Sequence, residues 1–86
     1  MDNPLHLPRN KVLIALLRRF RDEKGMTQAE LAAKLNTSQS TIGKCERGER
    51  ILGFVEVEEW CKALNYPFED FVRLYIETPV SIIESP

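Results

Sequence analysis

Two short helices, each preceded by a residue suited to cap it and joined by a sharp turn, are encoded between Thr27 and Gly48. Thr27 is followed three residues later by Glu30, the spacing at which a hydroxyl and a carboxylate each accept a hydrogen bond from the other residue's free backbone N–H group. Asn36 falls where the chain must turn, and Asn tolerates the left-handed conformation better than most residues other than Gly. Ser38 is placed to cap the next helix. Helices this short need a partner to pack against, so the sequence predicts two helices that cross each other closely.

The apolar residues of the two segments indicate which faces meet. Leu31, Ala32 and Leu35 form one stripe on the first helix, and the small Ala32 permits a close crossing. On the second helix, Ile42 and Cys45 point the same way. The other side of that helix carries short or polar residues, namely Gln39, Ser40, Gly43 and Lys44. The second helix therefore offers a polar surface to solvent.

Four groups of residues stand at spacings shared with a known family of regulators. They are Gly25-Met26-Thr27-Gln28, Glu30-Leu31-Ala32, Ile42 with Glu46-Arg47-Gly48, and an apolar helix ending in Ala63-Leu64-Asn65. On these residues, positions 13–75 resemble the lambda-repressor-like, Xre/Cro-type helix-turn-helix family of bacterial and phage proteins. The resemblance implies an all-α, five-helix DNA-binding domain whose second and third helices form the helix-turn-helix.

The chain departs from the family pattern at four positions. Asn36, Thr37 and Cys45 stand where the family mostly has Gly, an apolar residue, and Trp or Leu, respectively. Gly43 lies inside the second helix of the motif and costs about 1 kcal/mol of helix stability relative to Ala. None of the four breaks the expected fold.

Three more helices are predicted around this pair. Pro8 favours the start of a helix that ends near Lys24, before Gly25. The other two run over about 54–64 and from Pro67 to the Thr78-Pro79 stop. We expect a lead-in over residues 1–8, one domain over 9–77, and a C-terminal tail over 78–86.

The apolar positions of these helices repeat at helical spacing. They are Leu13, Leu16, Leu17 and Phe20, then Val57, Trp60, Cys61 and Leu64, and then Phe68, Phe71, Val72 and Tyr75. Aromatic residues in such a stripe are far more often core than ligand pocket, so we expect Trp60 and the stripe of Phe68, Phe71 and Tyr75 in the core. The tail sequence Val80-Ser81-Ile82-Ile83 has no helix to belong to and predicts a short β-like segment or an exposed dimer contact. A strip lying on the domain's own core, or a frayed end, is the alternative.

Composition excludes several classes of function. The 86 residues are 43% apolar and 29% charged, as in an ordinary soluble domain, and no apolar run approaches the roughly 18 residues of a membrane span. Residues 1–8 lack a basic start and an apolar stretch, so they predict no export signal and a cytoplasmic protein. Cys45 and Cys61 fall at apolar positions and are expected to be inert core thiols. With His6 as the one histidine, no metal site, catalytic arrangement, cofactor or small-molecule substrate is indicated.

The net charge of −1 conceals an uneven distribution along the chain. Residues 9–50 hold ten Lys/Arg against five Asp/Glu, a net +5, whereas residues 51–86 hold two against seven, a net −5. The basic part contains the helix-turn-helix motif, as a surface that faces DNA requires. Unevenly distributed solvated charge, without function, is the alternative.

The resemblance also implies roles for individual residues. By position, the candidates for reading base edges in the major groove are Gln39, Ser40 and Lys44, and those for binding phosphates are Gln28, Thr41, Arg21, Arg47 and Arg50. Arg21 and Glu46 correspond to a pair that ties the first helix to the third in family members. The alternatives are an ordinary polar helix surface, a Lys44 that touches only phosphate, and an Arg21 that only locks the helices.

These expectations combine into one functional hypothesis. The chain is predicted to be a non-enzymatic, sequence-specific regulator that binds double-stranded DNA as a homodimer on a palindromic operator, most simply as a repressor. The alternative is a protein-interaction module, or an antitoxin-type protein that binds a protein partner, built on the same fold. Neither hypothesis involves a membrane.

Overall fold

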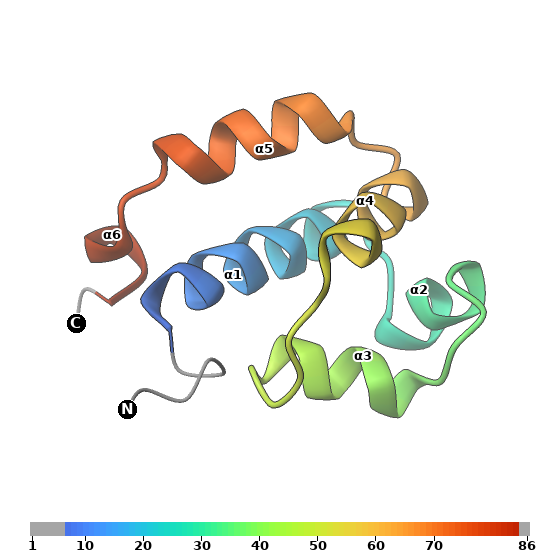
Figure 1. Cartoon of the computed structure of the whole chain (residues 1–86). Helices are drawn as coiled ribbons and strands as arrows, with labels where there is room; N and C mark the ends of the chain where they lie inside the picture. Colours follow the sequence, from blue (N-terminus) through green and yellow to red (C-terminus); the bar gives the residue numbers. More distant parts are fainter. Residues whose placement is uncertain (1–6, 85–86) are drawn as a thin grey trace.

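The chain folds into helices throughout. The computed structural model describes residues 7–84, and this part of the chain holds six helices and no strand. They are α1 (Pro8–Glu23), α2 (Gln28–Lys34), α3 (Gln39–Glu46), α4 (Phe54–Ala63), α5 (Phe68–Glu77) and α6 (Val80–Glu84) (Figure 1). The all-α fold and the five expected helices are confirmed, and a sixth helix is added in the tail. None of the helices in the described range is long and apolar enough to cross a bilayer.

Local capping sets the limits of α2 and α3, as the sequence predicted. The Thr27 hydroxyl accepts a hydrogen bond from the Glu30 N–H at 3.0 Å, and the Glu30 carboxylate accepts one from the Thr27 N–H at 2.9 Å. The Ser38 hydroxyl accepts from the Thr41 N–H at 3.2 Å. Asn36 in the intervening turn has a φ of 56°, the left-handed conformation that its side chain tolerates. These bonds satisfy N–H groups that every helix start leaves without an intrahelical partner.

The expectation of a β-like tail is wrong, because residues 80–84 form α6. The Thr78 hydroxyl donates to the Leu74 carbonyl at 2.7 Å, which closes α5, and Pro79 with its fixed φ then precedes a new helical turn. Contacts with the rest of the fold override the β preference of the Val and Ile side chains. α6 packs beside the first turns of α1, with Val80 against the core and Ile82 64% exposed (Figure 1).

The core takes buried side chains from each of the helices α1 to α5. Trp60 and Phe71 are buried as expected, at 4% and 1% exposure, while Phe68 and Tyr75 pack partly buried against the core. Phe20 of α1 stacks on Tyr66, with ring centroids 4.3 Å apart. The same ring meets Phe71 edge to face at 6.2 Å. These aromatic contacts hold α1 against the turn before α5 and against α5 itself.

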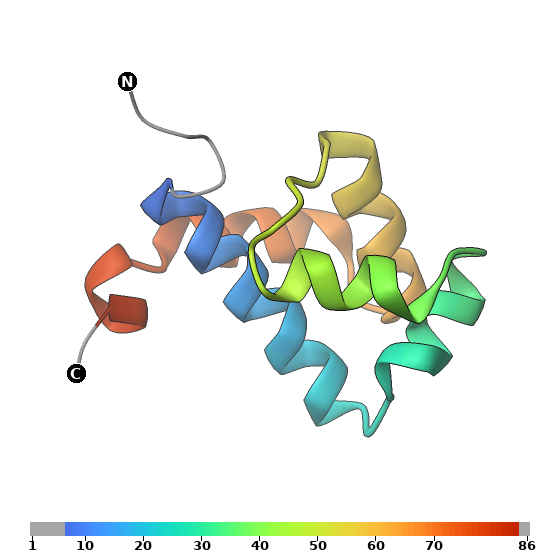
Figure 2. The ribbon, with the colours of Figure 1, turned by 90° about the horizontal axis from the view of Figure 1, so that it is seen from below.

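α3 and α5 lie on opposite sides of the molecule, with α1 between them (Figure 1). Seen from below, α3 runs across the front with no other helix over it (Figure 2). α6 lies at the far end of α1, away from α2 and α3. The C-terminal helix therefore leaves the outer face of α3 open.

Candidate nucleic-acid interface

One side of α3 is polar and faces solvent. Five residues, here called the polar face of α3, fall within about 140° of the helix circumference at 3.6 residues per turn: Gln39, Ser40, Gly43, Lys44 and Arg47. Ile42 and Cys45 point to the opposite side and are fully buried, with 0% exposure. Gln39, Ser40 and Lys44, the predicted base-reading residues, are all exposed. The structure thus brings these three exposed residues together on α3, whose ribbon lies uncovered by other helices in Figure 2.

A chain of hydrogen bonds supports this face from behind. The Arg21 guanidinium donates to both oxygens of Glu46, at 2.7 and 2.9 Å. Glu46 Oε1 also accepts from the Gln28 amide at 2.9 Å, and Gln28 Oε1 accepts from the Gln39 amide at 3.3 Å. Residues from α1, α2 and both ends of α3 are therefore linked in one network, which fixes the angle between α2 and α3.

The Arg21 and Glu46 side chains form a buried ion pair. Their side chains are 9% and 2% exposed. Burial alone would raise the pKa of Glu46, but the hydrogen bonds from Arg21 and Gln28 outweigh it and lower the pKa below its ordinary value. The Arg21 Nη1 also donates to the Met26 carbonyl at 2.7 Å. The structural pairing of Arg21 with Glu46 is confirmed, and the guanidinium is directed into the protein rather than toward the polar face of α3.

The network also orients the Gln39 amide. Gln28 donates its NH₂ group to the Glu46 carboxylate, so its carbonyl oxygen turns toward Gln39. Gln39 must then donate one N–H to Gln28, which leaves its other N–H and its carbonyl oxygen available. One donor and one acceptor side by side match the N7 acceptor and the N6 donor that adenine presents in the major groove.

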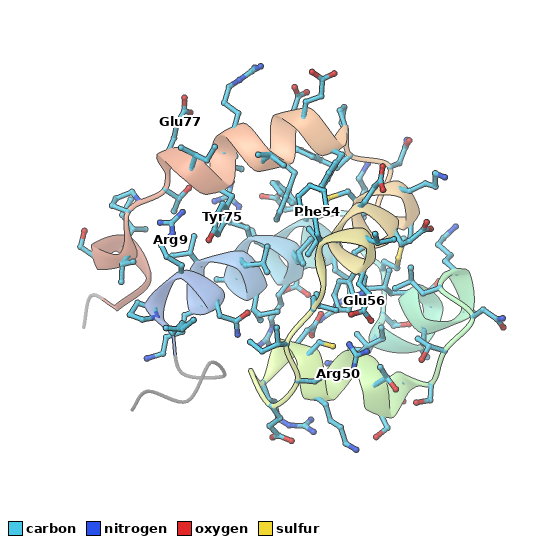
Figure 3. The ribbon with its side chains drawn as sticks, in the orientation of Figure 1. Arg9, Arg50, Phe54, Glu56, Tyr75 and Glu77 are labelled. Carbon is cyan, nitrogen blue, oxygen red and sulfur yellow. The ribbon has the colours of Figure 1, made fainter. Side chains whose placement is uncertain are left out.

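Two arginines lie beyond α3. Arg47, 58% exposed, forms an ion pair with Glu49 at 2.7 Å. Arg50, 42% exposed, donates to Glu56 of α4 at 2.7 Å, and its Nη1 lies 3.8 Å from the Cys45 sulfur (Figure 3). Both guanidiniums are solvent-accessible, and Arg50 also links the loop after α3 to α4.

Thr41, the remaining predicted phosphate contact, lies in the first turn of α3, and the two cysteines are buried. The Thr41 hydroxyl shares a hydrogen bond of 3.0 Å with the Ser38 hydroxyl at the start of α3. Cys45 and Cys61 are free thiols in the core, as expected, and burial raises the pKa of Cys45 and raises that of Cys61 to about 11. Thiols with a raised pKa are poor nucleophiles near neutral pH. His6 lies outside the described residues.

Sequence reasoning missed the acidic partners of the two arginines and an exposed apolar surface. Phe54, Val55 and Ile76, here called the apolar patch, are 74%, 65% and 69% exposed. Of these, Phe54 of α4 and Ile76 of α5 line an apolar groove of about 380 Å³, whereas Val55 lines a different hollow together with Thr41 and Arg50. A signal was present for Val55, which falls outside the buried spacing of α4, but not for Phe54, which stands three residues before Val57 and fits that spacing.

Known proteins are similar to this chain in both sequence and fold. A curated relative from Sinorhizobium fredii (strain NBRC 101917 / NGR234), called an uncharacterized HTH-type transcriptional regulator y4dJ, is 36% identical over 61 residues, which are 71% of this chain and 79% of that protein. The crystal structure of the wild-type restriction-modification controller protein C.Esp1396I is 29% identical, with a TM-score of 0.75 over 88% of this chain and 95% of that one.

A second structure shows C.Esp1396I as a tetramer in complex with its natural 35-base-pair operator, and it matches at a TM-score of 0.74, 29% identity and the same coverage, 88% and 95%. Residues 17–71 match the family model described as helix-turn-helix. This chain belongs to the Xre/lambda-repressor-like helix-turn-helix family of DNA-binding transcriptional regulators.

Proposed function

We propose that this protein is a sequence-specific regulator that binds double-stranded DNA through the polar face of α3. The observation that carries the proposal is the amide of Gln39, which is exposed on α3 and bonded to Gln28 through one N–H, so that its other N–H and its carbonyl oxygen are not used by that bond. A polar helix surface without function has no need of a network that begins at a buried ion pair and ends by orienting one of its exposed side chains. The excess of basic residues in 9–50 supports the same reading, because phosphates attract that half of the chain.

In the proposed complex, α3 lies in the major groove and α2 crosses the sugar-phosphate backbone. Gln39 pairs with adenine, Ser40 donates to or accepts from a base edge, and Lys44 donates to guanine. Gln28 at the start of α2, Thr41 and Arg50 bind phosphates, which set the register without reading sequence. Arg21 acts by holding Glu46 and not by touching DNA.

The proposed binding unit is a homodimer on a palindromic operator. One domain of this size covers too little DNA for a strong site, and two-fold dimers of such domains bind half-sites about 34 Å apart. The apolar patch supplies a surface that a second copy would cover, since Phe54 alone is 74% exposed. An operator occupied in this way excludes other proteins from the same DNA, which makes repression the simplest outcome. DNA as the target places the protein in the cytoplasm.

Selection of bound fragments from random duplex DNA tests the proposal. We expect the wild-type chain to enrich an imperfect palindrome and its affinity to fall steeply with salt. Gln39→Ala should lose about 5- to 150-fold on the enriched sequence while keeping its affinity for random DNA. Lys44→Ala should lose more affinity for the enriched sequence than for random DNA, which it also weakens because it removes a cation. Lys62→Ala is the matched control for Lys44→Ala, because both lysines lie in the last turn of a helix but Lys62 is on α4. Arg50→Ala should weaken binding to all sequences alike.

A protein-interaction or antitoxin-type module is the second candidate. The apolar patch and the net charge of −5 over residues 51–86 favour it, because a basic protein partner could bind there in place of a second copy of the chain. Affinity for duplex DNA that stays flat as salt increases, with no enriched sequence, would contradict the regulator and favour this module.

A further inference from the structure

A glycine lies under an arginine on the polar face of α3. Gly43 is buried, and a Cβ atom placed on it would lie 3.0 Å from Nη1 of Arg47 and 3.6 Å from Oε1 of Gln28. The backbone at Gly43 is ordinary α-helix, so no left-handed conformation requires glycine there. Gly is also the poorest helix former after Pro. What the glycine provides is space for the Arg47 guanidinium.

The direction of the Arg47 side chain follows from helix geometry. Arg47 directly follows α3 and keeps a helical backbone, with φ −87° and ψ 0°, and helical side chains lean toward the N-terminus of their helix. Its guanidinium therefore lies one turn back, beside Gly43, and at an angle around the helix between those of Gly43 and Lys44. That position is among the residues proposed to meet base edges.

Glu49 holds one edge of the guanidinium and leaves another open. The Glu49 carboxylate accepts from Nε at 2.7 Å and from Nη2 at 3.4 Å. The end of the fork, with one N–H on Nη1 and one on Nη2, is directed away from this pair. Two parallel N–H groups at the end of an arginine match O6 and N7 of guanine in the major groove.

We infer that Arg47 reads a guanine, with Gly43 and Glu49 as the residues that position its guanidinium. The inference rests on the proposed DNA-binding function and replaces the phosphate contact that the sequence suggested for Arg47. It makes Gly43 a specificity determinant, although glycine has no side chain to contact a base.

The selection experiment tests this assignment with variants that preserve charge. Arg47→Lys keeps the cation but loses the fork, so we expect an unchanged salt dependence and a loss of about 5- to 150-fold in preference for guanine at one base pair of each half-site. Arg19→Lys is the matched control, because Arg19 also has an acidic partner, Glu23 at 3.4 Å, but lies on α1. It should leave the enriched sequence unchanged.

A double-variant cycle tests the role of Gly43. Gly43→Ala should weaken the same guanine preference without lowering the melting temperature, because Ala favours helix and the displaced atoms are the flexible end of a side chain. In the Arg47→Lys background it should have no further effect at that base pair. Additive losses of guanine preference in the double variant would overturn the inference, and so would an Arg47→Lys loss spread equally over all sequences. In either case, a palindrome enriched by the wild-type chain would leave the proposed function intact. A wild-type chain that enriches no sequence would overturn both the inference and the proposed function.

Discussion

The guanidinium of Arg21 donates hydrogen bonds to both carboxylate oxygens of Glu46, at 2.7 and 2.9 Å, and so joins α1 to the end of α3. The Glu46 side chain is only 2% exposed, so its charge has little contact with water. Gln28 donates an amide N–H to the same carboxylate, and its carbonyl oxygen accepts a hydrogen bond from the Gln39 amide. The stability of the domain and the geometry of the proposed DNA-binding surface thus depend on the same pair.

Removing one partner of this pair should destabilise the domain strongly. We expect Arg21→Met to lower the free energy of unfolding by about 3–5 kcal/mol, because it leaves a buried carboxylate without its cation. Urea denaturation measures the change. Arg19→Met, which breaks the exposed pair with Glu23, should cost less than about 1 kcal/mol. Equal losses in the two variants would show that the buried pair has no special role.

Stability should also decrease in acid through Glu46. The folded-state pKa of Glu46 lies below the ordinary 4.5, so the unfolded chain binds the proton more tightly. The contribution of this group is therefore complete above about pH 4.5 and is lost as the pH falls through the lowered folded pKa. Unfolding curves between pH 6 and pH 2 should show a shallower acid slope for Glu46→Gln than for wild type. The Arg47 guanidinium also lowers the pKa of the exposed Glu49, but solvent screens that pair, so Glu49→Gln should flatten the acid slope less than Glu46→Gln does. An unchanged slope in Glu46→Gln would contradict the assignment.

The features that the sequence predicted correctly are the local ones. A cap needs residues only three positions apart, so Thr27, Glu30 and Ser38 could be assigned from spacing alone. The left-handed φ of 56° at Asn36 follows from the residue type and its place in the turn. The buried faces of the helices follow from their periodicity.

The features that the sequence could not show depend on contacts between distant residues. Val80 and Ile82 have a β preference of their own, and only packing against α1 decides for helix. Arg9 and Thr78 meet although 69 positions separate them. The place of the Arg47 guanidinium over Gly43 depends on the path of a long side chain, which helical spacing does not fix. The pair of Arg21 and Glu46 could be named only through the family resemblance.

Arg9 should anchor the C-terminal helix. Its Nη1 donates to the Thr78 carbonyl at 2.6 Å, its Nη2 donates to the Tyr75 carbonyl, and its guanidinium lies 4.2 Å from the centre of the Tyr75 ring (Figure 3). A cation at these carbonyls complements the negative end of the α5 dipole. We expect Arg9→Met to lower the free energy of unfolding by about 1.5–3 kcal/mol and to speed amide exchange at Ile82, whose N–H donates to the Pro79 carbonyl.

Arg73→Met is the control for this variant, because Arg73 is an exposed arginine on α5, the helix whose last carbonyls Arg9 binds. It should change neither the stability by more than about 0.5 kcal/mol nor the exchange rate at Ile82. Exchange at Ile82 that is as slow in Arg9→Met as in wild type would show that α6 is held by Val80 and its apolar contacts alone.

The apolar patch should be the contact between two copies of the chain. Phe54 is 74% exposed and packs edge to face on Phe68, with ring centroids 5.3 Å apart, so the ring is held outward over the groove. Phe54→Glu places a charge where a partner would cover the ring, and we expect the mass measured by sedimentation to fall from dimer to monomer. Affinity for the full palindrome should then fall steeply, while affinity for a single half-site stays unchanged. Ile82→Glu is the matched control, because Ile82 is 64% exposed on α6, and it should leave the dimer intact. Dissociation by Ile82→Glu but not by Phe54→Glu would move the dimer contact to the tail, where the sequence first placed it.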